Sequence, residues 1–209
     1  MAPDASIDFW FDFASPYGYF MSEKIEALAA QYRRRVRWRP VLLFAVLRRL
    51  ELPAPLENAV KRDYMQRDFE RSARFLGLPY IPPDRFPIVT QHAARAFYLL
   101  ERDVPEAAVP FAHQAMRGYF CDSAALDDPL QVARWAAEAA PEIGDVEAVA
   151  GFIAGDAPKA LLAGAVEEAV RARVFGSPLV VIDGEPFFGV DRLPQIEACL
   201  AGRLAPSTL

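Results

Sequence analysis

The chain has 209 residues, a length that fits one domain, with or without a large insertion. Its composition is 53% hydrophobic, with 15 Phe, 7 Tyr and 3 Trp, which supports a substantial core and excludes a disordered or collagen-like chain. The net charge of -5 argues against a nucleic-acid partner, although basic residues cluster at positions 33–39. Because this cluster alternates with Val36 and Trp38, we interpret it as the solvated face of a strand.

Nothing in the sequence predicts a membrane segment or a metal site. No stretch approaches the ~18 consecutive apolar residues of a membrane helix, and residues 1–6 lack the features of a secretory signal. We therefore expect a cytoplasmic protein with no membrane partner. Cys121 and Cys199 lie far apart outside any CxxC motif, and His92 and His113 lack metal-pair spacing. We expect two buried free thiols and no metal.

The N-terminal part predicts a β-α-β unit. Residues 7–13 read I-D-F-W-F-D-F, an apolar and aromatic run typical of a strand. Ser15 suits the N-cap of a following helix and Pro16 suits its first position, where an amide would have no partner. The helix is expected to run to about Tyr32, and residues 36–42 form the second strand. Two strands joined by a helix pair in parallel.

The middle of the chain, from about residue 44 to 175, shows helical spacing and no convincing strand. A helix is predicted at residues 59–76, where Gly77 and Pro79 form a stop signal. Further helices are expected near residues 91–101, 109–119, 130–139, 146–153 and 159–175.

Strand patterns return at the C-terminal end. Residues 178–182 are apolar and β-branched, Asp183-Gly184 is a hairpin turn, and residues 185–188 form the partner strand. Residues 193–200 close the chain as a helix. The order is that of an α/β thioredoxin-like domain (residues 1–43 and 176–209) with a large all-helical domain (residues 44–175) inserted between its halves.

The stretch F-D-F-A-S-P-Y-G at positions 11–18 carries the main chemical signal. Redox proteins of the thioredoxin type carry C-P-x-C at this helix start, where the helix field stabilises a thiolate. Here Ser15 and Gly18 occupy the two cysteine positions. A helix N-terminus and a hydroxyl that favour a negative sulfur suggest a sulfur brought by a ligand, and glutathione is the abundant candidate. Alternatively, Ser15 is an ordinary N-cap.

Two further segments extend this hypothesis. Ser177-Pro178 precedes the third strand, where a cis-proline in thioredoxin folds lets the preceding backbone pair with an extended peptide. Asp191 follows Gly189 at the last helix and can accept from an ammonium group, with backbone amides beside it. Alternatively, Pro178 is a trans-proline at a strand start and Asp191 is a plain N-cap.

These motifs, together with K-R-D-Y-M-Q-R-D at positions 61–68, resemble the 2-hydroxychromene-2-carboxylate isomerase family, close kin of the kappa-class glutathione transferases. The resemblance implies that Ser15 contacts the glutathione sulfur and is catalytic, and that Ser177 beside Pro178 binds the cysteinyl backbone. It also implies that Asp191, with the Val190 amide, holds the γ-glutamyl end.

The resemblance places Lys61 near the glycyl carboxylate of glutathione, while a solvated helix lysine is the equal alternative. An aromatic pocket formed by Tyr17, Phe44, Phe86 and Phe120 would take a small aromatic or enone substrate, although each ring also suits a core position. Relatives commonly read G-N-x-P-P before the lysine helix, and this chain has Leu52 in place of the Asn.

The implied function is glutathione-dependent cis–trans isomerisation of an aromatic-degradation intermediate such as 2-hydroxychromene-2-carboxylate, by reversible thiolate addition in a homodimer. Two alternatives stay open: a kappa-like glutathione transferase, and a catalytically idle thioredoxin-fold binding module.

Overall fold

One mixed sheet forms the centre of the computed structural model, which describes residues 6–204. Its strands are β1 (Ile7–Phe11), β2 (Val36–Pro40), β3 (Leu179–Ile182) and β4 (Glu185–Phe188), in the order β2-β1-β3-β4. β1 runs parallel to β2 and antiparallel to β3, and β4 is antiparallel to β3. The predicted β-α-β unit and terminal hairpin therefore join in one sheet, as expected.

The aromatic run of β1 builds the core of this sheet. Phe9 lies opposite Trp38 of β2 and Val180 of β3. The rings of Phe9 and Phe11 stack at 4.8 Å between centroids, and both meet Trp38 edge-on. All four side chains are buried. Such aromatic contacts add to the hydrophobic gain of burial and fix the register of the central strands.

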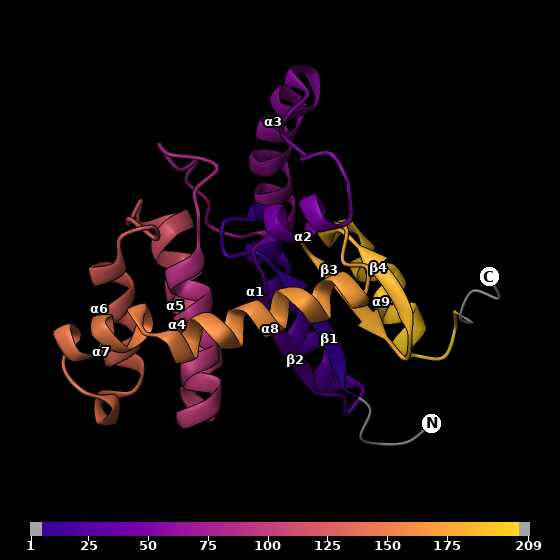
Figure 1. The fold of residues 1–209 in the computed structure, drawn as a ribbon. Helices are drawn as coiled ribbons and strands as arrows, with labels where there is room; N and C mark the ends of the chain where they lie inside the picture. Colours follow the sequence, from indigo (N-terminus) through magenta and orange to yellow (C-terminus); the bar gives the residue numbers. More distant parts are fainter. Residues whose placement is uncertain (1–5, 205–209) are drawn as a thin grey trace.

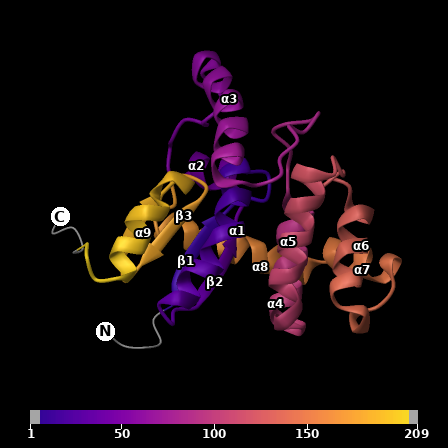
Figure 2. The ribbon, with the colours of Figure 1, turned by 180° about the vertical axis from the view of Figure 1, so that it is seen from behind.

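Helix α1 (Pro16–Gln31) follows β1 and begins at the residues that the sequence predicts. At the other end of the chain, the short helix η2 (Val190–Arg192) and α9 (Leu193–Leu200) pack against α1. Figure 2 shows α1 and α9 on one side of the sheet, whereas α8 crosses the other side in Figure 1.

The segment between β2 and β3 consists of helices and loops and contains no strand, as predicted. Its helices are α2 (Leu43–Arg49), α3 (Ala59–Leu76), α4 (Gln91–Asp103), α5 (Pro105–Cys121), α6 (Pro129–Ala139), α7 (Val146–Ala154) and α8 (Asp156–Arg171), with a short turn η1 (Pro141–Ile143). α3 rises above the edge of the sheet at which α1 begins (Figures 1 and 2).

Three details of this helical segment differ from the prediction. The sequence did not indicate α2. α5 begins at Pro105, before the expected position 109, because Pro105 takes the first helical position and the helix continues through Pro110. α8 ends at Arg171, before the expected position 175, since Arg173 adopts a left-handed conformation with φ 55° and turns the chain toward β3.

Helix α8 connects the helical group to the sheet. It packs against α4 and α7 of this group and also against α2, which follows β2. Glu168 of α8 pairs with Arg39 of β2 at 2.6 Å, and Glu167 pairs with Arg49 of α2. By length and apolar composition, no single helix in residues 6–204 can span a membrane; α7 and α8 meet that test only as a pair, bent by 52°.

Candidate functional site

Ser15 caps the N-terminus of α1. Its Oγ accepts from the Gly18 amide at 3.1 Å, so the predicted N-cap is confirmed. The same hydroxyl donates to the backbone oxygen of Ser177 at 3.0 Å. Pro16 has no amide proton, and the Tyr17 amide forms no hydrogen bond within residues 6–204. The helix therefore offers one free amide and its dipole to a ligand at this end.

A cavity of about 600 Å³ opens at the same end of α1. Its wall is largely apolar, and residues 53–58 of the α2–α3 connection form one side. The aromatic side chains that line it are Tyr17, Phe44, Tyr64, Phe69, Phe86, Phe175 and Phe188. Four of these, Phe44, Tyr64, Phe175 and Phe188, are more than 40% exposed, so the cavity is open to solvent. Its volume and apolar wall are typical of a small-molecule site.

The loop before β3 also lines the cavity, through Phe175, Gly176 and Ser177. Ser177 is 8% exposed, and its Oγ accepts from the amide of Asp12 at 2.9 Å. The Ser177-Pro178 bond is cis, as expected. A Cβ at Gly176 would stand 2.1 Å from the Phe188 ring, so a larger residue there would require this exposed ring to move. The predicted approach of Ser177 to Ser15 is confirmed.

Asp12 ties together three segments around the site. Its carboxylate accepts from the amides of Ala14 and Leu43 and from the Thr90 hydroxyl, each at 2.9 Å. Burial raises the pKa of Asp12, and these three hydrogen bonds act in the opposite direction. The loop after β1, the start of α2 and the start of α4 thus meet at one carboxylate.

Helix α3 is held to α1 by a second carboxylate. The Tyr17 hydroxyl donates to Asp68 at 2.5 Å, and Arg71 also pairs with Asp68. Burial and the Asp68 charge raise the pKa of Tyr17, and the charge of Asp191 adds to this effect. The pKa of Asp68 is lowered, because its hydrogen bonds outweigh its burial. Tyr17 therefore stays protonated and donates.

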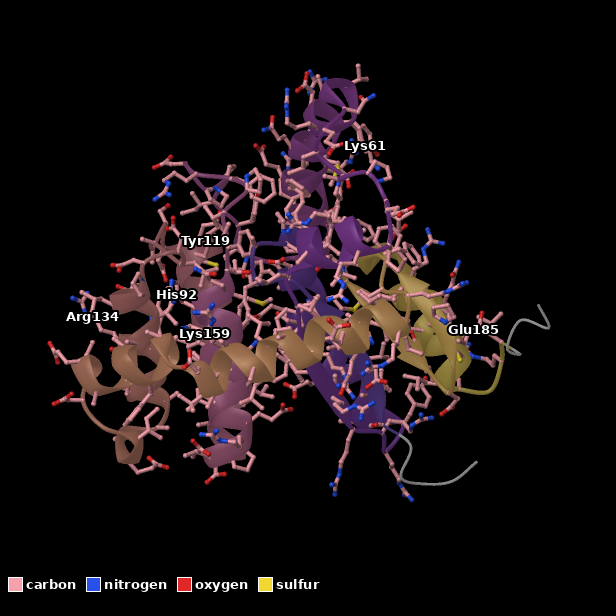
Figure 3. All side chains as sticks on the ribbon, viewed as in Figure 1. Lys61, His92, Tyr119, Arg134, Lys159 and Glu185 are labelled. Carbon is pink, nitrogen blue, oxygen red and sulfur yellow. The ribbon has the colours of Figure 1, made fainter. Side chains whose placement is uncertain are left out.

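The structure gathers most of the predicted site residues at the cavity. Ser15, Ser177, Lys61, Tyr17, Phe44 and Phe86 line it. Lys61 lies on α3 beside the connection from α2 (Figure 3), and its ammonium group has no ion pair with any described residue.

Three other predicted residues do not line the cavity. Pro178 and Val190 are buried, with Val190 5% exposed. Asp191 is exposed and pairs with Arg192 at 2.5 Å, although its charge reaches Tyr17. Asp191 lies on η2, which packs against α1.

The expectation that Phe120 lines the pocket is wrong. Phe120 is 0% exposed and lies on α5, where its ring stacks on Tyr19 at 5.3 Å and contacts Tyr80. Its neighbour Tyr119 lies in the helical group away from Lys61 (Figure 3). Phe120 is a core residue that helps to pack α5 against α1.

Sequence reasoning also missed residues that shape the site. Asp12 and Asp68 position the segments around it, and Asn58 lines the cavity while it caps α3 by accepting from the Lys61 amide at 3.0 Å. Asn58 had a usable signal, since Asn before a helical pattern is a common N-cap. Within residues 6–204, no group of three or more His, Cys, Asp or Glu side chains is placed to hold a metal ion.

Comparisons with known proteins agree with this architecture. The chain is 29% identical to 2-hydroxychromene-2-carboxylate isomerase of Sphingobium xenophagum over 93% of this chain and 97% of that protein. It is 27% identical to glutathione S-transferase kappa 2 of Caenorhabditis elegans over 93% and 91% of the two chains. The resemblance predicted from the motifs is thus confirmed.

A solved structure of 2-hydroxychromene-2-carboxylate isomerase is similar in fold, with a TM-score of 0.79 and 23% identity over 95% of both chains. The model of the DSBA-like thioredoxin domain family matches residues 6–201. This match spans nearly the whole described chain, from β1 to α9, and includes the helical segment between β2 and β3. The protein belongs to the family of DSBA-like thioredoxin domains.

Proposed function

We propose that the protein is a glutathione-dependent enzyme that isomerises a small aromatic enone by reversible thiolate addition. The observation that carries the proposal is the N-terminus of α1, where the Ser15 hydroxyl meets an apolar cavity. A helix N-terminus stabilises a negative sulfur, yet Ser15 and Gly18 supply none. The sulfur therefore has to come from a ligand, and glutathione is an abundant cellular thiol.

The groups around the cavity fit this tripeptide. The backbone oxygen of Ser177 now accepts from Ser15 Oγ. A cysteinyl amide can replace that donor, as in the addition of a strand, and release the Ser15 hydroxyl for the sulfur. Lys61 suits a carboxylate, and Asp191 suits the α-ammonium group of the γ-glutamyl end.

The protein's own part in the reaction is electrostatic and geometric. When bound, glutathione would supply a thiolate that adds to the enone, allows rotation about the former double bond, and leaves as the double bond re-forms. The Ser15 hydroxyl donates to the sulfur, and the α1 dipole favours its negative charge. The aromatic wall that includes Phe44, Phe86 and Phe188 holds a flat substrate beside the sulfur.

The two classes of relatives support two reactions at this site. The Sphingobium xenophagum relative carries the name of an isomerase, and for that reason we put isomerisation of a compound such as 2-hydroxychromene-2-carboxylate first. The kappa-class relative from Caenorhabditis elegans supports conjugation as the second candidate. Both reactions need the same bound thiolate and differ in whether the thiol is returned.

One assay separates these reactions. The purified protein is incubated with glutathione and 2-hydroxychromene-2-carboxylate, while ultraviolet absorbance and free thiol are followed together. Isomerisation with constant thiol supports the isomerase, whereas stoichiometric loss of thiol supports the transferase. If neither occurs and glutathione does not bind, the proposal is wrong and a binding module remains.

A further inference from the structure

The hydrogen bonding of the Ser177 side-chain hydroxyl is incomplete. Its Oγ accepts from the Asp12 amide at 2.9 Å, and within residues 6–204 the hydroxyl donates no hydrogen bond. The residue is 8% exposed and lines the cavity. Buried polar groups nearly always form their hydrogen bonds. The acceptor for this proton is therefore expected to come from a bound ligand.

The side chains of Ser177 and Ser15 converge beside Gly18. Ser15 Cβ and Ser177 Oγ lie 3.1 and 3.2 Å from the point at which a Cβ of residue 18 would stand. Ser15 Oγ is also 3.0 Å from the backbone oxygen of Ser177. The two side chains therefore approach the same point at the start of α1.

Asp12 fixes the direction of this second hydroxyl. The three hydrogen bonds to its carboxylate, from Ala14, Leu43 and Thr90, hold the end of β1 in place. The Asp12 amide is thereby kept on Ser177 Oγ. With one lone pair engaged by that amide, the hydroxyl is left as a preorganised donor.

We propose that Ser177 is a second catalytic hydroxyl, which donates to the glutathione sulfur together with Ser15 and helps to keep it as a thiolate. The inference rests on the proposed glutathione site. It adds a side-chain role to Ser177, beyond the backbone pairing with the cysteinyl residue. Each charge-assisted hydrogen bond to a thiolate lowers the pKa of the thiol by about one unit or more.

The test is an ultraviolet titration of the bound thiolate at saturating glutathione. Ser177→Ala should raise the pKa of the bound thiol by about one unit, and turnover at neutral pH should fall about tenfold and recover at higher pH. Ser177→Thr keeps the hydroxyl and should restore both values. Ser22→Ala is the matched control, because it removes a buried α1 hydroxyl that donates to Tyr19 and lies away from the cavity.

The outcomes separate this inference from the proposed function. An unchanged thiol pKa in folded Ser177→Ala that still binds glutathione overturns the inference and leaves the proposed function intact. Failure of the unaltered protein to bind glutathione, or to lower its thiol pKa, overturns both. If Ser177→Ala does not fold, Ser177→Val against Ser177→Thr makes the same comparison, since the two side chains have the same shape and differ in the hydroxyl.

Discussion

The charged residues that line the cavity differ in whether another residue of the protein pairs with their charge. Asp12 is 8% exposed, and its carboxylate accepts three hydrogen bonds from within the protein, so its role is structural. Glu57 and Lys61 are exposed, and in residues 6–204 neither forms an ion pair. Lys61 is therefore the cation that this wall offers to a ligand carboxylate, and its exposure limits the strength of that interaction.

Lys61→Gln should weaken glutathione binding only modestly. An exposed ion pair contributes about 0.2–1 kcal/mol, which corresponds to a rise in Kd of up to about fivefold. The effect should shrink in high salt because exposed charges are screened. Calorimetric titration measures it, with Arg62→Gln as the control, since Arg62 is the next residue and does not line the cavity. Equal Kd values for the two variants would show that Lys61 is a solvated helix lysine that does not contact the ligand.

The role of a single residue can be predicted from sequence when the residues it contacts are close to it in the chain. Ser15 could be identified from sequence because Ser-Pro directly after a strand marks a helix start. Asp12 could not, because two of its partners, Leu43 and Thr90, lie 31 and 78 residues away. Phe120 was misassigned for the related reason that an aromatic residue at helical spacing suits a core as well as a pocket.

At the scale of elements, periodicity predicted most helices and all four strands, and it failed at α2. This helix has no side-chain cap of its own: Leu42 takes the N-cap position, and the amide of Leu43 is satisfied by Asp12 from the β1 loop. A start signal that is supplied by a distant residue cannot be read locally. The start of α2 therefore depends on a tertiary contact and not on its local sequence.

Helices α1 and α5 are joined by a charged cluster that titrates. Burial alone would lower the pKa of His113, but Glu23 and Glu26 outweigh it and raise this pKa to about 9. Glu23 is half-buried, which raises its pKa, yet His113 and Arg117 lower this pKa to about 2. Since the pKa of His113 is higher in the folded than in the unfolded state, its stabilisation is complete below about pH 6.5 and is lost as pH rises through 9.

His113→Gln should therefore lower the free energy of unfolding near pH 6 by about 1 kcal/mol and have little effect above pH 10. Urea unfolding at both pH values measures the difference. His92→Gln is the contrasting control: burial and Arg95 lower the pKa of His92, so its titration favours the unfolded state at acidic pH, and its removal should cause no loss of stability specific to pH 6. A deficit of equal size at both pH values would show that His113 acts through packing alone.

At the scale of the whole molecule, the chain keeps the architecture of a DSBA-like thioredoxin domain without its pair of cysteines. The two cysteines that it does contain, Cys121 and Cys199, lie on α5 and α9. Both are free, as expected, but they are half-buried and not buried. Burial raises the pKa of each thiol, so neither is an activated nucleophile. The start of α1 therefore carries no thiol of its own.

The protein should accordingly fail to reduce insulin disulfides or to oxidise dithiols. Ser15 and Gly18 leave nothing at the start of α1 that can form a mixed disulfide. The turbidity assay with insulin and dithiothreitol measures this, with a thioredoxin as the positive control. Activity that survives replacement of both Cys121 and Cys199 by Ser would place the active centre elsewhere.

The central claim, that the Ser15 hydroxyl and the α1 N-terminus hold a glutathione thiolate, is tested most directly by titrating bound glutathione in the unaltered protein and in Ser15→Ala. Loss of one charge-assisted hydrogen bond of about 1.5–3 kcal/mol should raise the pKa of the bound thiol by about one to two units. Turnover at neutral pH should fall about ten- to a hundredfold, while glutathione still binds. Loss of the N-cap costs about 1 kcal/mol of stability, so the melting of the variant is measured first. An unchanged thiol pKa and unchanged turnover in folded Ser15→Ala would contradict the account and leave Ser15 as an N-cap alone.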